Sequence, residues 1–182
     1  QENGLEAVDQ IVDRIMQEEA FYERLQEAFN DILLIRGYDG VPETALSYEH
    51  FEHRNWYQKY DLSSVGDEDA QREARYKLAR EYREAMLREP LELIKYIVRT
   101  ERPFTEILTA DYIMVSPYTS RGYGIYEELK GKFKDHNDPF EYIPARLPSL
   151  QHRDGRSHQE SPTGFYPHAG LLSTFQYLKR YP

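Results

Sequence analysis

The largest concentration of side chains that could do chemistry lies late in the chain, between Gln151 and His168. Imidazole and carboxylate groups gather there, and neutral imidazole is a common ligand of zinc and iron. The spacing matches no standard metal motif, so three interpretations stay open. The simplest is a polar surface loop whose arginines pair with its acids; the others are a metal or haem-proximal site and a general acid–base site. The candidate metal ligands are His152, Asp154, His158, Glu160 and His168, with His158 and His168 the expected pair to face a metal, a haem edge or a partner's acid.

A second pair of histidines, His50 and His53, lies in an aromatic segment from Tyr48 to Asp61. Residues three apart meet on one face of a helix, so these imidazoles could share a metal. A third ligand would have to come from Glu49, Glu52 or a distant segment. Paired histidines among aromatic residues more often serve packing and hydrogen bonding, which is the preferred interpretation.

The least ordinary stretch runs from residue 101 to residue 124. Pro103 fits the first turn of a helix, and Ser116-Pro117 is a second pair of N-cap and first-turn residues. Between them, Tyr112 to Val115 is a buried run too short to assign as strand or helix from periodicity. Gly122 and Gly124, which can adopt positive φ, close the stretch.

Asp111 is the catalytic candidate of this stretch, because it could act as a carboxylate base. The preferred interpretation is structural: Asp111 accepts hydrogen bonds from the backbone amides that follow Ser116 or Tyr118 and so holds Tyr112–Val115 in the core. Arg102 and Glu106, four residues apart, are likewise expected to form a structural ion pair.

The elements that must position these residues are helices. Apolar spacings of three and four predict two helices between residues 4 and 36, meeting at a bend near residues 17–20 and ending at Gly37. Asp67 caps a charged helix to Arg88, and Pro90 is expected to end that helix and open another. The sequence therefore predicts an all-α, irregular multi-helix domain with six or seven helices around Leu91–Val98 and a long proline-rich loop excursion.

The proline-rich region divides the chain. We expect a helical domain at residues 1–133, a long ordered loop at 134–167, and a helix at 168–182, with helical periodicity at 169–179, that begins a following module. A loop of this length is usually functional or disordered. Aromatic residues on either side of its polar run give it apolar surface to bury, and we expect it to be held on the helices by Phe140, Tyr142, Phe165 and Tyr166.

Composition limits the partners. The 182 residues carry a net charge of −9, which argues against a nucleic-acid partner. No apolar run approaches a membrane span. The chain has no cysteine, which excludes disulfides and covalent haem attachment within it and leaves the compartment open. The 16 tyrosines indicate half-buried packing between helices, or an extended interaction surface.

Residues 102–112, Arg-Pro-Phe-Thr-Glu-Ile-Leu-Thr-Ala-Asp-Tyr, resemble the signature of a family of uncharacterised bacterial domains. These occur in large exported proteins of planctomycetes and myxobacteria that often carry or neighbour cytochrome c modules. Val12 to Leu25 resembles the family's opening helices, and Pro167 to Ser173 resembles the start of the module that usually follows. The resemblance marks as structural signature residues Arg102, Pro103, Thr105, Glu106, Asp111 and Tyr112.

The resemblance implies a haem-free segment of an exported, cytochrome-associated assembly, periplasmic or extracellular, with a scaffolding or docking role in electron transfer. No cofactor would be covalently bound, and a haem or metal could come from a neighbouring chain. The alternatives are an interaction module without a redox role, and a metal-dependent enzyme that uses the histidine loop. The expected partners are other protein chains or further segments of the same protein, which would cover the apolar face of the last helix.

Overall fold

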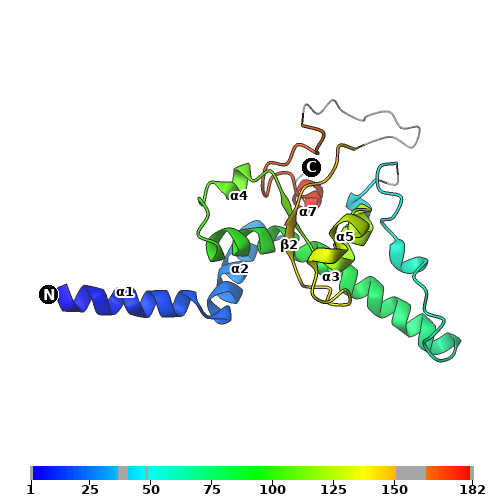
Figure 1. Cartoon of the computed structure of the whole chain (residues 1–182), viewed down its shortest axis with the longest axis horizontal. Coiled ribbons are helices and arrows are strands. Elements are labelled where there is room, and N and C mark those ends of the chain that lie inside the picture. Colours follow the sequence, from blue (N-terminus) through cyan, green and yellow to red (C-terminus); the bar gives the residue numbers. More distant parts are fainter. Residues whose placement is uncertain (1, 37–40, 48, 151–162, 181–182) are drawn as a thin grey trace.

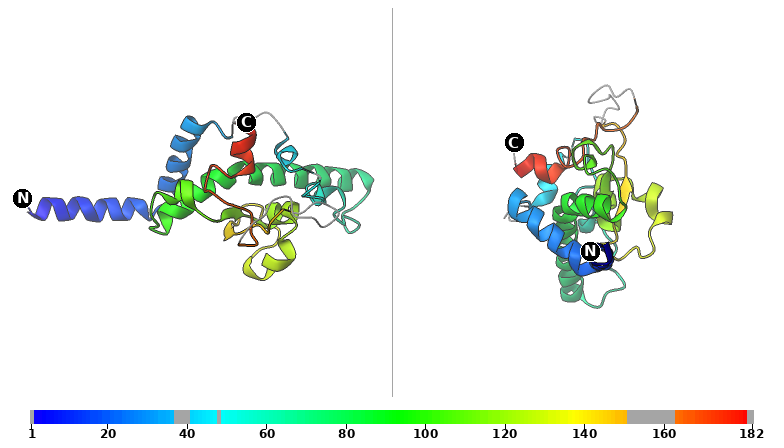
Figure 2. Two further views of the ribbon diagram at one scale, coloured as in Figure 1. Left: turned by 90° about the horizontal axis from the view of Figure 1, so that it is seen from above. Right: turned by 90° about the vertical axis from the view of Figure 1, so that its left-hand side faces the viewer.

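The computed structural model describes residues 2–36, 41–47, 49–150 and 163–180. Two helices open it, α1 (Glu2–Met16) and α2 (Glu19–Leu33), and the break between them confirms the predicted bend. α1 extends away from the rest of the molecule, whereas α2 turns back onto it (Figures 1 and 2). Glu19 of α2 binds Lys95 and Arg99, which fixes α2 on the long helix α3. α2 ends before the predicted Gly37, because Leu34 takes the left-handed conformation and donates its amide to Asn30 O.

The helix α3 (Glu68–Arg99) crosses the whole body of the molecule (Figure 1). As predicted, the Asp67 carboxylate accepts the Ala70 amide, 2.9 Å away, at its N-terminus. The prediction that Pro90 separates two helices is wrong, because α3 continues through it. An interior proline costs a helix about 3 kcal/mol. Burial of Met86, Leu91 and Leu93 on both sides of Pro90 supplies the tertiary packing that offsets this cost.

The stretch from residue 101 to residue 124 folds into three short elements, α4 (Glu106–Thr109), β1 (Ile113–Val115) and α5 (Pro117–Tyr123). Ser116 caps α5 as expected: its hydroxyl accepts the amides of Tyr118 and Thr119, and the Thr119 hydroxyl accepts the Ser116 amide. Gly124 ends α5 at φ 78°, also as expected. Gly122 serves a different purpose, since a Cβ there would lie 2.0 Å from the Tyr82 hydroxyl oxygen.

The run that the sequence left ambiguous is a strand. β1 pairs antiparallel with β2 (Ile143–Ala145), with Met114 opposite Pro144, so the largely helical fold also contains a small two-stranded sheet. Along the chain, the helix α6 (Tyr126–Leu129) and the 3₁₀ turn η3 (Lys130–Lys132) follow α5 and precede β2. Two further 3₁₀ turns, η1 (Pro42–Ala45) and η2 (Trp56–Gln58), connect α2 to α3.

The chain is held on the rest of the molecule both before and after β2. The Tyr142 hydroxyl donates to Ala85 O, 2.7 Å away, and the Arg88 guanidinium lies 4.3 Å from the Phe140 ring centroid. The Tyr166 amide binds Leu147 O at 2.9 Å, while Phe165 lies under the Arg146 guanidinium. The four expected aromatic anchors therefore all make contacts, two of them to α3 and two to the chain just after β2.

The final helix is shorter than the 169–179 that periodicity predicts. Only α7 (Phe175–Arg180) is helical, because residues 170–174 form turns bound to α4. The Gly170 amide binds Ala110 O at 2.8 Å and the Leu171 amide binds Ile107 O at 2.7 Å. Phe175 packs in the core, while Leu172 and Leu178 remain exposed. The division of the chain into domains at residues 133 and 167 stays a prediction.

Buried apolar residues form two clusters along α3. The first surrounds Tyr82 and Met86 and includes Val115 of β1. The second surrounds Leu93, Ile94 and Ile97. The predicted centre at Leu91–Val98 is thus the centre of one core of two, and α3 connects them. Within the described ranges, no helix combines the length and apolar character needed to cross a membrane.

Candidate functional site

The signature residues form a small polar network at the surface of α4. Arg102 Nε donates to Glu106 Oε2 at 2.6 Å, which confirms the predicted pair, and the Tyr112 hydroxyl donates to the same oxygen at 2.8 Å. The guanidinium lowers the pKa of the Glu106 carboxyl, and burial raises the pKa of the Tyr112 hydroxyl. Glu106 Oε2 thus accepts from both Arg102 and Tyr112, and this shared acceptor stabilises the turn before β1.

The predicted role of Asp111 is wrong. Its side chain is 67% exposed, and its described partner is Arg146, with 3.5 Å between Oδ2 and Nη2. The amides that Asp111 was expected to bind are those of Tyr118 and Thr119, and the Ser116 hydroxyl accepts both. Ser116 is fully buried and one residue after the strand, so it reaches those amides where Asp111 cannot.

Four of the five predicted metal ligands, His152, Asp154, His158 and Glu160, lie outside the described residues. The fifth, His168, is half-buried and accepts the Leu147 amide at Nε2, 3.1 Å away, beside the Tyr166 ring. Burial, with the nearby Arg146, lowers the pKa of the imidazole to about 4. His168 therefore uses Nε2 to hold the chain beside β2, and the metal role of the five-residue set stays a prediction.

The histidine pair near η2 does not lie on a helix. Residues 49–55 form turns, His50 lines a hollow with Tyr123 and Leu147, and His53 lines another with Trp56 and Arg121. His53 Nε2 lies 3.3 Å from Glu52 Oε1. No group of three or more histidine, aspartate or glutamate side chains in the described ranges is placed to hold a metal ion.

A buried carboxyl group that the sequence analysis missed lies at the centre of the molecule. Glu89 Oε2 accepts the Tyr123 hydroxyl at 2.5 Å, and Oε1 has no hydrogen-bond partner among the described residues. Burial raises the pKa of this carboxyl to about 8. The available signal was its place among the apolar residues Met86, Leu87, Pro90 and Leu91.

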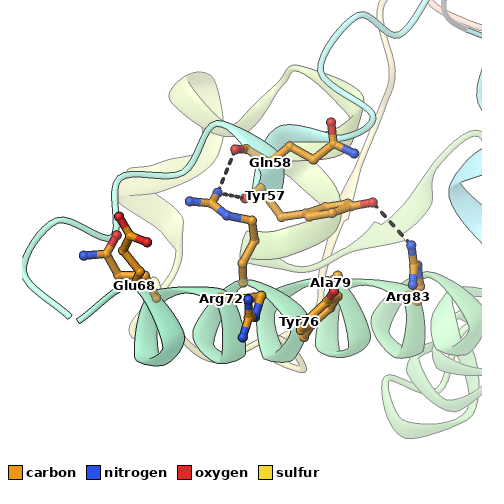
Figure 3. Close-up of a pocket in the computed structure, with 9 residues that line it drawn as sticks. Tyr57, Gln58, Glu68, Arg72, Tyr76, Ala79 and Arg83 are labelled. Atoms are coloured by element: carbon orange, nitrogen blue, oxygen red, sulfur yellow. Dashed lines mark hydrogen bonds between the residues drawn. The ribbon is translucent and has the colours of Figure 1, made fainter. Parts of the chain in front are cut away.

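A groove of about 540 Å³ between η2 and the first turns of α3 is a candidate binding site (Figure 3). Arg75 spans it and donates to the carbonyl oxygens of Tyr57 and Gln58, each 2.7 Å away. At its other end, the Tyr57 hydroxyl lies between Arg83 and the buried Glu43. The sequence predicts only a charged helix here; the missed signal is arginine and tyrosine at spacings of three and four. The lining residues are Tyr57, Gln58, Glu68, Gln71, Arg72, Arg75, Tyr76, Ala79 and Arg83.

A second surface feature is the apolar face of α1. Val8, Ile11, Val12 and Ile15 lie along one side of this helix, and their side chains are 46–58% exposed. The helix projects from the body in Figure 1 and in the left view of Figure 2, so the described body does not cover this face.

A family model described as PSD4, a protein of unknown function (DUF1592), matches residues 3–125, about two thirds of the chain. This chain belongs to the PSD4 family. The match includes α1, the groove, Glu89 and the signature at 102–112, whereas β2 and α7 lie beyond it. No curated protein and no solved structure matches the chain.

Proposed function

We propose that this PSD4 chain is a structural and docking module of a larger protein assembly. The observation that carries the proposal is the apolar face of α1, which the described body leaves uncovered. A face of this kind on a projecting helix costs free energy in water, because apolar area contributes roughly 25 cal/mol per Å² when it is buried. An amphipathic helix laid in an apolar groove is a recurrent mode of protein recognition.

The charges of α1 indicate what covers it. Across residues 6–16, Glu6, Asp9 and Asp13 outnumber the single base, Arg14. Two copies of α1 placed side by side would bring these acids together, and like charges at an interface oppose association. The occupant is therefore an apolar surface with a basic border on another protein segment.

The assembly that we propose is exported and cytochrome-associated, with this chain as its haem-free docking part. That context rests on the resemblance at residues 102–112 and at Pro167–Ser173. A chain with no cysteine is compatible with it, because any haem would be carried by a neighbouring segment or chain.

The test is photo-crosslinking in the native assembly, with a photoreactive amino acid in place of Val12. We expect crosslinked peptides from one apolar, basic-bordered polypeptide segment. The matched control places the same group at Gln10 on the opposite face of α1, where we expect none. Crosslinks from Val12 only to another α1, or to no polypeptide, would contradict the docking role. The absorption of the same assembly at visible wavelengths separates a docking role in electron transfer from a docking role without redox chemistry, since haem absorbs strongly at these wavelengths.

A further inference from the structure

The Arg75 side chain is held by one of its three nitrogens. Nη1 donates to the carbonyl oxygens of Tyr57, Gln58 and Tyr60, at 2.7, 2.7 and 3.3 Å. Neither Nε nor Nη2 donates to any described residue, and no carboxylate of the described chain lies within 4.0 Å of this guanidinium. The edge formed by Nε and Nη2 is the one that grips a carboxylate with two parallel hydrogen bonds. Arg75 thus presents a fixed, uncompensated fork in the groove.

The other two arginines of the groove differ from Arg75. Arg83 is neutralised, because its Nε lies 2.8 and 3.1 Å from the two carboxylate oxygens of the buried Glu43. Arg72 pairs with Asp69 at 2.7 Å, and both side chains are more than two-thirds exposed. An exposed pair of this spacing is weak, so Arg72 can turn to a ligand at little cost.

The remaining walls of the groove are aromatic and amide groups. The Tyr57 ring is fixed by hydrogen bonds of its hydroxyl with Glu43 and Arg83, and the Tyr76 ring is 69% exposed at the rim. Amide side chains at Gln58 and Gln71 complete the lining. A volume of about 540 Å³ lies within the range usual for small-ligand pockets, and fixed rings offer flat apolar area.

We propose that this groove binds a carboxylate carried on an aromatic or other flat apolar body, with the Arg75 fork on the carboxylate and the body between Tyr57 and Tyr76. One uncompensated fork matches one carboxylate. Glu68, the acid of the lining, opposes a more highly charged anion such as a phosphate monoester. The site lies at the end of α3 remote from α1, so it does not rest on the docking role proposed above (Figure 1).

The carboxylate could belong to a free organic acid or to the end of a polypeptide, and titration of the whole chain followed by ¹H–¹⁵N NMR separates them. One arm adds benzoate, with benzamide as its uncharged match. The other adds an alanine tetrapeptide ending in phenylalanine, with a free or an amidated terminus. We expect saturable shifts of the Arg75 Nε–H and of the amides near Tyr57 with the carboxylates only. Tighter binding of the free peptide identifies a polypeptide source, and tighter binding of benzoate a small acid.

Two variants decide whether the fork is responsible. Arg75→Lys keeps the charge and a donor for the carbonyl oxygens but loses the fork, so carboxylate affinity should fall roughly tenfold. Arg80→Lys, at an exposed arginine of the same helix outside the groove, should leave it unchanged. Arg72→Gln, at an exposed position, should weaken binding roughly two- to fivefold, and it decides the question if Arg75→Lys unfolds. Unchanged affinity in the folded variants, equal binding of benzamide, or no saturable shift with either carboxylate would overturn the proposal.

Discussion

The carboxyl group of Glu89 lies fully buried, with the Tyr123 hydroxyl 2.5 Å from Oε2, and burial raises its pKa to about 8. It therefore binds a proton more tightly in the folded than in the unfolded chain, where glutamate titrates near pH ~4.3. Above that pH the unfolded state loses its proton first. The stabilising contribution of Glu89 to the free energy of unfolding is thus complete below about pH 4.3, and it is lost as the pH rises to about 8.

We predict that Glu89→Gln removes a pH dependence of this sign. The wild-type free energy of unfolding should fall, relative to the variant, by about 1.4 kcal/mol per pH unit across that window. Urea unfolding from pH 4 to pH 9 measures the difference. Glu84→Gln, on the same helix, is the control. Burial raises the pKa of the Glu84 carboxyl, but Arg88 and Arg36 outweigh burial and hold that pKa below its ordinary value. The pH dependence that Glu84→Gln removes should therefore have the opposite sign. Parallel curves for wild type and Glu89→Gln would show that Glu89 is ionised in the folded protein.

Gly122 illustrates close packing at a single residue. An added Cβ would meet the Tyr82 hydroxyl oxygen at 2.0 Å and Cζ at 2.7 Å, and Tyr82 is fully buried. We predict that Gly122→Ala lowers the free energy of unfolding by about 1–3 kcal/mol, because the ring cannot move without disturbing the core. Gly131→Ala, whose Cβ would meet nothing within 4 Å, should change it by less than about 0.5 kcal/mol. Equal effects of the two substitutions in thermal unfolding would disprove the packing argument.

At the scale of elements, the short helix α5 is fixed by its cap. The Ser116 hydroxyl is fully buried and accepts the amides of Tyr118 and Thr119, each at 3.3 Å. α5 is only seven residues long, so propensity alone would not stabilise it. The cap and the packing of α5 against α3 hold it in place.

We predict that Ser116→Ala destabilises the protein by about 1–3 kcal/mol, since two buried amides lose their acceptor. The matched control is Thr105→Ala at the N-cap of α4, where the threonine side chain makes no capping hydrogen bond. That substitution should change the free energy of unfolding by less than about 0.5 kcal/mol. Chemical denaturation measures both, and a larger loss at Thr105 than at Ser116 would contradict the assignment.

At the scale of the whole molecule, the C-terminal segment docks on the signature. Gly170 has φ 52°, and a Cβ there would lie 2.2 Å from Ile107 O. The adjoining amides bind Ala110 O and Ile107 O, which seats Leu171 in the second core and Phe175 in the first. One close backbone approach thus connects residues about sixty positions apart.

We predict that Gly170→Ala releases this segment, seen as faster hydrogen exchange of the Leu171 and Thr174 amides. Gly164→Ala is the matched control, because Gly164 also has positive φ, 74°, but its Cβ would meet no atom within 4 Å. The control shows the cost of backbone strain alone, about 1 kcal/mol. Equal exchange in the two variants would mean that strain, not the close approach, governs docking.

The sequence alone determined the features that depend on neighbouring residues. Interactions that span four residues or fewer account for these features: the break between α1 and α2, the Asp67 and Ser116 caps, the end of α5 at Gly124, and the Arg102–Glu106 pair. Such interactions are written in the local order of side chains, and tertiary contacts rarely reverse them.

Only the tertiary structure decided the features that depend on distant segments. Pairing with residues 143–145 makes Tyr112–Val115 a strand, and core packing carries α3 through Pro90. The amides that Asp111 was expected to bind donate instead to the Ser116 hydroxyl. Glu89 is buried because two apolar cores meet along α3. The groove likewise needs η2 beside α3, which brings the Tyr57 and Gln58 carbonyls to Arg75 from 18 and 17 residues away. Local patterns hold no information on such contacts, because the free energy that selects them is gained only when the segments pack together.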